Sequence, residues 1–156
     1  MLAENTVLTG RRAITRSYAK INLTLDVLSK RENGYHDIKM IMQTVSLFDL
    51  ILVDKTHRGI SISTNLPYLP CNEKNIAYKA ADAFFKATGI RSGAKIVIHK
   101  NIPVAAGLAG GSGNCAAVLT AINMLHGNPL SNDELMHIGA SLGADVPYCF
   151  DGGTQL

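Results

Sequence analysis

The segment with the clearest chemical potential is a glycine-rich stretch over residues 102–114, with the sequence IPVAAGLAGGSGN. It runs directly into an apolar, alanine-rich segment that ends near Leu125 and is typical of a buried helix. Glycines let backbone N–H groups come close to a ligand, and the start of a helix carries the positive end of its dipole. The junction is therefore suited to bind phosphate, although a tight strand-to-helix connection would use the same residue types.

Two familiar glycine loops do not match this stretch. The nucleotide-binding pattern G-x-x-x-x-G-K-[ST] needs a lysine after the glycines, and none follows here. The hydrolase pattern G-x-S-x-G also fails, because Asn114 stands where its last glycine would be.

Three segments, taken in order, resemble the GHMP kinases, a family that includes galactokinase, homoserine kinase and mevalonate kinase. The phosphate loop of that family is similar to P-x-x-x-G-L-A-G-G-S, which begins at Pro103. The other two segments are AKINL at residues 19–23, followed by GYH at residues 34–36, and GADVP at residues 143–147. The resemblance extends from about Ser17 to the end of the chain. The three segments together, in this order, are most similar to the branch of the family whose acceptor is a cytidine diphosphate-linked methylerythritol.

A kinase that acts on an alcohol needs a base for the hydroxyl proton and positive charge near the transferring group. The resemblance implies that Asp145 is this base and that Lys20 is its partner. Strand alternation predicts that Lys20, Asn22 and Thr24 share one face, and the resemblance assigns Asn22 to the substrate site. The residue types alone are equally typical of a turn aspartate and a solvated strand lysine.

The resemblance also implies an ATP site with bound Mg²⁺. Asn75 and Lys100 would line its adenosine pocket, although a helix N-cap and a solvated strand end are the structural alternatives. The Ser112 hydroxyl could contact phosphate or Mg²⁺, or cap the following helix. The predicted ATP-binding residues are Asn75, Lys100, Pro103, Gly107, Leu108, Ala109, Gly110, Gly111, Ser112, Gly113 and Asn114.

Tyr35 and His36 follow a predicted hairpin turn. An aromatic ring beside a hydrogen-bonding side chain suits a pyrimidine base. The resemblance implies that Tyr35 stacks on the cytosine of the substrate and that His36 reads its polar edge. The alternative is that Tyr35 packs against the hairpin and His36 is a surface residue.

The phosphate loop departs from the family pattern at two positions. Gly113 replaces a second serine, and Cys115 replaces a usual alanine. We expect Gly113 to remove one hydroxyl from the phosphate and magnesium site, leaving the backbone N–H groups to bind phosphate.

The predicted elements form one α+β domain over residues 1–156, with a mostly antiparallel sheet and helices packed on one side. This is the fold implied by the resemblance, the ribosomal protein S5 domain 2-like amino-terminal domain of the GHMP kinases. Strands are predicted at residues 14–28, 40–53 and 59–64 as an antiparallel meander, with a hairpin turn at Asn33-Gly34.

Helices and further strands follow this meander. One helix is predicted over residues 75–88, capped by Asn72 or Asn75, and a strand over residues 94–100. A capping box at residues 131–134 opens a helix to about Leu142, and the tail over residues 146–156 is predicted as a strand. The tail stops in mid-pattern, so we expect the carboxy-terminal domain of the family to lie beyond it.

Composition excludes several classes of protein. The chain has 156 residues, 47% of them hydrophobic, which is enough for one substantial core. A formal charge of +3 with scattered Lys and Arg is too weak to predict nucleic-acid binding. No apolar run suits a membrane span or a secretion signal. The 3 cysteines lie far apart, which favours neither disulfides nor a zinc site and indicates the cytoplasm.

Alternative interpretations stay open at this level. The chain could be another GHMP kinase that acts on a sugar, homoserine or mevalonate-type alcohol, or a fragment that binds nucleotide without catalysis. The antiparallel sheet with helices on one side also occurs in domains that bind RNA or nucleotides, which would need a basic stripe and aromatic platforms. The sequence does not specify an oligomeric state.

Overall fold

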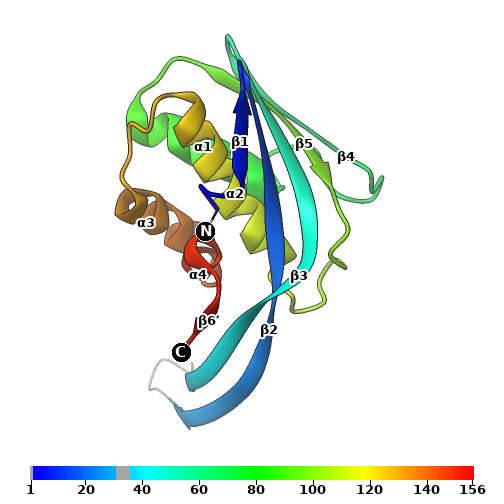
Figure 1. Cartoon of the computed structure of the whole chain (residues 1–156), viewed down its shortest axis with the longest axis vertical. Helices are drawn as coiled ribbons and strands as arrows, with labels where there is room; N and C mark the ends of the chain where they lie inside the picture. Colours follow the sequence, from blue (N-terminus) through cyan, green and yellow to red (C-terminus); the bar gives the residue numbers. More distant parts are fainter. Residues whose placement is uncertain (1, 31–35) are drawn as a thin grey trace.

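The computed structural model describes residues 2–30 and 36–156, which form a bent sheet covered on one face by helices (Figure 1). The strands are β1 (Thr6–Thr9), β2 (Arg12–Lys30), β3 (His36–Thr56), β4 (Gly59–Thr64), β5 (Gly93–His99) and β6 (Thr154–Gln155). The helices are α1 (Ile76–Thr88), α2 (Gly110–Leu125), α3 (Asn132–Leu142) and α4 (Val146–Asp151). The predicted α+β class, with helices on one side of the sheet, is confirmed.

The long hairpin of β2 and β3 is the frame of the sheet. The two strands pair antiparallel from Arg12 opposite Asp54 to Lys30 opposite His36, as predicted. The turn predicted at Asn33-Gly34 lies outside the described residues. The strand order is β1-β2-β3-β5-β4, and β6 pairs with β3 beyond this path. Strand β1, which pairs antiparallel with β2, was not predicted.

The predicted meander is wrong at its third strand. β5, rather than β3, is the neighbour of β4, and β4 and β5 run parallel. Helix α1 lies between them in the sequence and supplies the long crossover that parallel strands require. Gly93 starts β5 where it enters between β3 and β4. A Cβ atom there would lie 2.3 Å from the Gly59 carbonyl oxygen, so no larger residue fits without a shift.

Helices α1 and α3 begin at the predicted caps. The Asn75 side chain accepts a hydrogen bond from the Ala77 N–H at 2.9 Å, so Asn75 rather than Asn72 is the N-cap of α1. At α3 the Ser131 hydroxyl accepts from the Glu134 N–H, and the Glu134 carboxylate accepts from the Ser131 N–H. This reciprocal pair satisfies two helix-end donors and confirms the capping box.

Helix α2 is the centre of the core. Every residue from Gly113 to Asn123 is buried, because the helix packs against the sheet on one side and against the other helices elsewhere. Alanines at positions such as Ala116, Ala117 and Ala121 allow this close approach. Buried side chains of β3, β5 and α1, including Ile51, Ile96 and Phe84, complete the core. The start of α2 is therefore held rigidly from several directions.

The predicted strand in the tail is wrong for most of its length. Residues Val146–Asp151 form α4, and only Thr154–Gln155 is strand. Pro147 stands in the first turn of α4, where a missing N–H costs no helical hydrogen bond. Val146, Tyr148 and Phe150 are buried in alternation, as in a strand. This short helix is packed on two sides, because the Tyr148 hydroxyl also bonds Thr44 of β3 at 2.9 Å.

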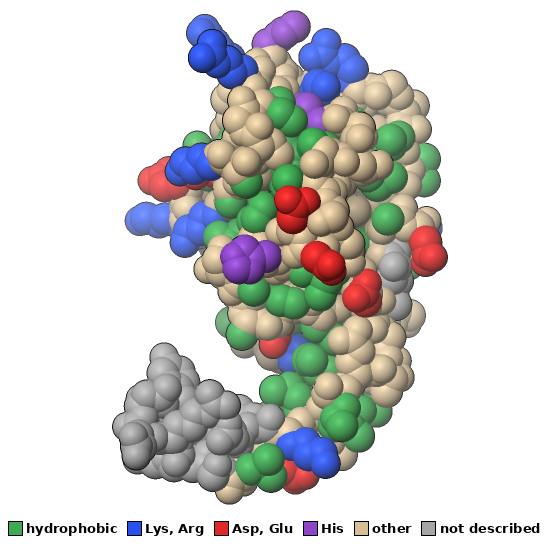
Figure 2. Space-filling view, turned by 90° about the vertical axis from the view of Figure 1, so that its left-hand side faces the viewer, with side chains coloured by type: hydrophobic (Ala, Val, Ile, Leu, Met, Phe, Trp, Pro, Cys, Tyr) green, Lys and Arg blue, Asp and Glu red, His purple; other side chains and the backbone are tan. Residues whose placement is uncertain are grey.

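The face that carries the helices has charges of both signs. Most Asp and Glu side chains lie over its middle, while Lys and Arg side chains lie mostly at the top of the view and along its upper left edge (Figure 2). Within residues 2–30 and 36–156, no helix has the length and apolar character needed to cross a membrane.

Candidate active site

The glycine-rich loop between β5 and α2 has an unusual backbone. Ala105, Gly107 and Ala109 have φ values of 57°, 73° and 55°, in the left-handed region. This region costs a residue with a Cβ atom about 1 kcal/mol, so two alanines in it indicate a loop held in shape by its surroundings. Part of that hold comes from β2, because the Lys20 N–H donates to the Leu108 carbonyl oxygen at 3.1 Å.

The start of α2 has backbone donors that no side chain of its N-cap residue satisfies. Its N-cap residue is Ala109, which makes no side-chain capping bond. The predicted alternative of a cap by Ser112 is therefore wrong, since Ser112 lies inside the first turn. The first N–H groups of the helix point out of its end, where the helix dipole is positive. Such an end favours a phosphate group.

A cavity of about 490 Å³ opens in front of this helix end. It is lined by the glycine-rich loop, the start of α1, the first turn of α2 and Asp145. All the predicted ATP-binding residues line it except Gly113. Asn75 therefore contributes to the cavity wall and caps α1 at the same time. Its side-chain amide also donates to the Pro70 carbonyl oxygen at 2.8 Å, which fixes the side chain against the loop before α1.

Gly113 faces the sheet instead of the cavity. A Cβ atom at this position would lie 2.4 Å from the Ser17 Oγ and 3.4 Å from the Tyr18 carbonyl oxygen. The prediction that Gly113 belongs to the ATP site is therefore corrected. Glycine at this position allows α2 to lie close to β2 and removes no hydroxyl from the cavity. Cys115, the other departure, is also buried in the core.

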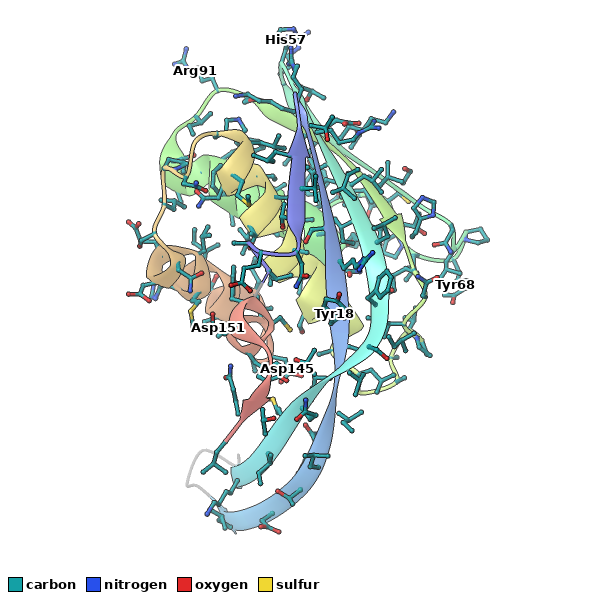
Figure 3. All side chains as sticks on the ribbon, viewed as in Figure 1. Tyr18, His57, Tyr68, Arg91, Asp145 and Asp151 are labelled. Carbon is teal, nitrogen blue, oxygen red and sulfur yellow. The ribbon has the colours of Figure 1, made fainter. Side chains whose placement is uncertain are left out.

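Lys20 and Asp145 meet beside the cavity, as the resemblance implied. The Lys20 Nζ lies 3.4 Å from the Asp145 Oδ2, and it donates to the Asn22 Oδ1 at 3.0 Å. Lys20 is 4% exposed, whereas the Asp145 side chain is 37% exposed. Asp145 is the residue before α4, yet its carboxylate makes no capping bond. The carboxylate is thus available to the cavity, at the place where α4 approaches the sheet (Figure 3).

An irregularity in the sheet directs the Lys20 side chain. Tyr18 pairs with Phe48 and Lys20 with Thr44, so Ala19 alone faces three residues of β3, and the alternation breaks. Ala19 and Lys20 are consequently both buried. A second shift follows between Asn22 and Thr24. Asn22 pairs with Met42 and Thr24 with Ile41, and adjacent residues of a strand point to opposite faces. The prediction of one polar face is therefore confirmed for Lys20 and Asn22 and is wrong for Thr24.

The predicted substrate residues beyond Asn22 are not described in full. Tyr35 lies outside the described residues, and His36 is described only as the first residue of β3. Their assignment to a cytidine site stays a prediction.

Two features of the site were missed by sequence reasoning. Lys100 forms an ion pair with Asp49, a fully buried residue in the middle of β3. Its signal in the sequence is a single carboxylate inside the apolar run SLFDLILV. The second feature is the Asn114 side chain, whose Oδ1 is buried and has no hydrogen-bond partner in the described part of the chain. A buried polar atom without a partner beside a cavity is a frequent sign of a ligand contact.

The donors around the cavity suit a hard cation better than a soft one. No group of three or more His, Cys, Asp or Glu side chains able to hold a metal occurs within the described residues. Asp145, Ser112 and Asn114, three residues with side-chain oxygens, all line the same cavity. Mg²⁺ is usually bound by a small number of protein oxygens together with phosphate oxygens of the substrate, and this cavity offers such a combination.

The fold is that of a known kinase family. The family model described as "GHMP kinases N terminal domain" matches residues 75–153, half of the chain. This chain therefore belongs to the GHMP kinase family.

Within the family, the chain is similar to proteins named 4-diphosphocytidyl-2-C-methyl-D-erythritol kinase. It is 52% identical over 141 residues to that protein of Clostridium botulinum strain Alaska E43, covering 90% of this chain and 50% of the relative. It is 54% identical over 142 residues to that of Clostridium perfringens strain ATCC 13124, covering 90% and 49%. The chain thus spans about half the length of these curated relatives.

A solved structure gives the same result in three dimensions. The crystal structure of a 4-(cytidine 5'-diphospho)-2C-methyl-D-erythritol kinase superimposes with a TM-score of 0.77 and 36% sequence identity. The match covers 88% of this chain and 48% of that one.

Proposed function

We propose that the protein transfers the γ-phosphoryl group of ATP to the 2-hydroxyl of 4-diphosphocytidyl-2-C-methyl-D-erythritol, a step in non-mevalonate isoprenoid precursor synthesis. The observation that carries the proposal is the Lys20–Asp145 pair beside a cavity lined by the uncapped start of α2. The similarity to kinases named for this substrate supports the choice of acceptor. The proposed compartment is the cytoplasm, whose reducing conditions suit the free cysteines Cys71, Cys115 and Cys149.

In the proposed reaction, the loop and the start of α2 hold the triphosphate through backbone N–H groups. Asp145 accepts the proton of the acceptor hydroxyl, whose oxygen forms the new bond to the γ-phosphorus. The bond from this phosphorus to the β,γ-bridging oxygen breaks, and ADP leaves with the electron pair. The Lys20 Nζ lies 3.4 Å from the Asp145 Oδ2 and supplies positive charge beside the transferring group. Positioning and charge stabilisation provide most of the catalysis in reactions of this class.

Mg²⁺ fits this site as a companion of the triphosphate. Ser112, Asn114 and Asp145 are the residues that would hold it, together with phosphate oxygens. The bound ion would neutralise charge on the transferring group.

The acceptor would lie on the side of Asp145 that Lys20 and Asn22 share. We assign Asn22, Tyr35 and His36 to it, with Tyr35 stacking on the cytosine. The mixed charges on the helical face give little of the basic stripe that an RNA-binding domain would present there (Figure 2).

Two titrations by calorimetry test the proposal on this chain. One uses a non-hydrolysable ATP analogue with Mg²⁺, and the other uses cytidine diphosphate-linked methylerythritol. Heat with both supports the proposed kinase, and heat with the ATP analogue alone favours a GHMP kinase with another acceptor. Phosphorus NMR of the complete protein with ATP and the acceptor then tests turnover. Nucleotide binding without any phosphorylated product would reduce the function to nucleotide binding.

A further inference from the structure

Asp49 is a charged side chain in the most apolar part of the sheet. It lies in β3 within the run SLFDLILV and is 0% exposed. A buried carboxylate is costly unless hydrogen bonds and an opposite charge compensate for the lost water. Its partners therefore account for its presence in the core.

Among the described residues, the partners of the Asp49 carboxylate come from one short segment, where β5 ends and the glycine-rich loop begins. Its Oδ1 accepts hydrogen bonds from the N–H groups of Asn101 and Ile102, each at 2.8 Å. Its Oδ2 accepts from the Lys100 Nζ. One carboxylate thus contacts three consecutive residues and ties the first part of the loop to the sheet.

Lys100 extends this tie to the start of α2. A Cβ atom built on Gly110, the first residue of α2, would lie 2.9 Å from the Lys100 Nζ. The ammonium is therefore packed against the helix end, where the dipole is already positive. The Lys100 backbone is also held, because its N–H donates to the Asn65 Oδ1 at 2.7 Å.

We propose that Asp49 is a positioning residue of the phosphate site. Through two backbone N–H groups it fixes the loop, and through Lys100 it holds a positive charge at the first turn of α2. The charge of Lys100 then acts on the nucleotide phosphates from a fixed position. The part of this inference that concerns nucleotide rests on the proposed function, whereas the part that concerns the loop does not.

Four variants of the chain separate these contributions. Asp49→Asn removes the negative charge, and Lys100→Met removes the ammonium while leaving Asp49 bonded to the loop. The double variant Asp49→Leu with Lys100→Met removes both charges together, which protects folding because no unpaired charge stays buried. The control is Asp54→Asn on the same strand, whose carboxylate pairs with Arg12 at 2.6 Å at the surface.

The first measurement is amide hydrogen exchange of the nucleotide-free chain. We expect the N–H groups of Asn101 and Ile102 to exchange about tenfold faster in the Asp49→Asn and double variants, since each loses a charged acceptor. Lys100→Met and Asp54→Asn should match the wild type at these two positions. Equal exchange in all variants, or faster exchange spread evenly over the sheet and α2, would overturn the positioning role.

The second measurement is affinity for the Mg²⁺ complex of a non-hydrolysable ATP analogue. We expect Lys100→Met to bind it about tenfold more weakly, and the double variant to bind more weakly still because its loop is loosened. Asp54→Asn should bind like the wild type. If the double variant binds the analogue with the same affinity as Lys100→Met, Asp49 contributes nothing to nucleotide binding beyond its ion pair with Lys100, and that part of the proposal is overturned. If the wild-type chain binds no analogue, the proposed nucleotide site fails, while the exchange experiment still decides whether Asp49 holds the loop.

Discussion

The Lys20 ammonium and the Asp145 carboxylate lie 3.4 Å apart although 124 residues separate them in the chain. Lys20 comes from the irregular part of β2 and Asp145 from the residue before α4. The pair is one-sided, because Lys20 is buried and Asp145 is partly open to the cavity. This is the arrangement expected of a base that exchanges protons with a ligand beside a fixed counter-charge.

The first prediction concerns Asp145. Asp145→Asn in the complete protein should lower kcat by about 10²- to 10⁴-fold, the usual contribution of a general base. The Kd of the ATP analogue should change by less than about threefold, because the backbone donors of α2 are untouched. The measurements are steady-state kinetics and calorimetry. Asp151→Asn at the exposed end of α4 is the matched control (Figure 3), and an unchanged kcat would remove Asp145 from the base role.

The second prediction concerns the contact between α2 and β2. Gly113→Ala should destabilise the fold by about 1–3 kcal/mol, because its Cβ would lie 2.4 Å from the Ser17 Oγ. Ser17→Ala removes this oxygen, which has no partner among the described residues, and should restore most of the loss when combined with Gly113→Ala. Urea unfolding of the single and double variants measures the coupling. Gly111→Ala, where the nearest atom is at 3.7 Å, is the stability control.

If Gly113→Ala and Gly111→Ala have the same free energy of unfolding, the close approach at Gly113 is not a constraint. A coupling free energy below about 0.5 kcal/mol between the substitutions at positions 17 and 113 would likewise show that this close approach does not constrain the fold.

The third prediction concerns thiol reactivity. Burial raises the pKa of Cys115 and of Cys149 to about 12. The Cys149 thiol raises the pKa of Cys115 further, and the Asp145 carboxylate raises that of Cys149 further. Cys71 is exposed. At about pH 8, iodoacetamide should therefore modify Cys71 rapidly and leave the other two unmodified, since the thiolate is the nucleophile. Mass spectrometry reads the sites, and all three should react in denaturant. Rapid modification of Cys149 in the native chain would contradict this packing.

The fourth prediction concerns the capping box of α3. Ser131→Ala should cost about 1 kcal/mol of stability at neutral pH. Hydrogen bonds from the Ser131 N–H and hydroxyl lower the pKa of Glu134 below its ordinary value of 4.5. The stabilisation is therefore present above about pH 4.5 and is lost as pH falls through the lower pKa of the folded state. Thermal unfolding from acid to neutral pH measures this. Ser131→Ala should flatten the acid limb, and an unchanged limb would argue against the box.

Local signals were sufficient for the ends of elements. Asn75 and Ser131 begin their helices as predicted, because an N-cap depends on residues within one helical turn. The β2–β3 hairpin was likewise predicted, because its pattern and turn signal are local. Strand order was not, since β5 joins the sheet between β3 and β4 only after α1 has formed the crossover. The alternating burial of Val146, Tyr148 and Phe150 led to a strand where a short helix is packed on two sides.

In the candidate site, too, contacts between residues far apart in the sequence could not be predicted from local patterns. Residue patterns could identify the glycine-rich loop, but the pairing of Lys20 with Asp145 came only from resemblance, because nothing local relates β2 to α4. Asp49 was missed for the same reason: its partners are more than 50 residues further along the chain. Gly113 was assigned to the ATP site because it belongs to the glycine-rich stretch, whereas helical geometry turns that residue toward β2.

The glycine-rich loop also predicts how the protein tolerates sequence drift. Its N–H groups belong to the peptide backbone, so any side-chain exchange in the loop other than one to proline leaves them in place. Selection on such a loop acts on curvature, and Ala105 and Ala109, with φ values of 57° and 55°, are the positions where a change to glycine relieves conformational cost. Bulky or β-branched side chains at these two positions would disfavour the left-handed backbone conformation and so distort the loop, although its N–H groups would still be present.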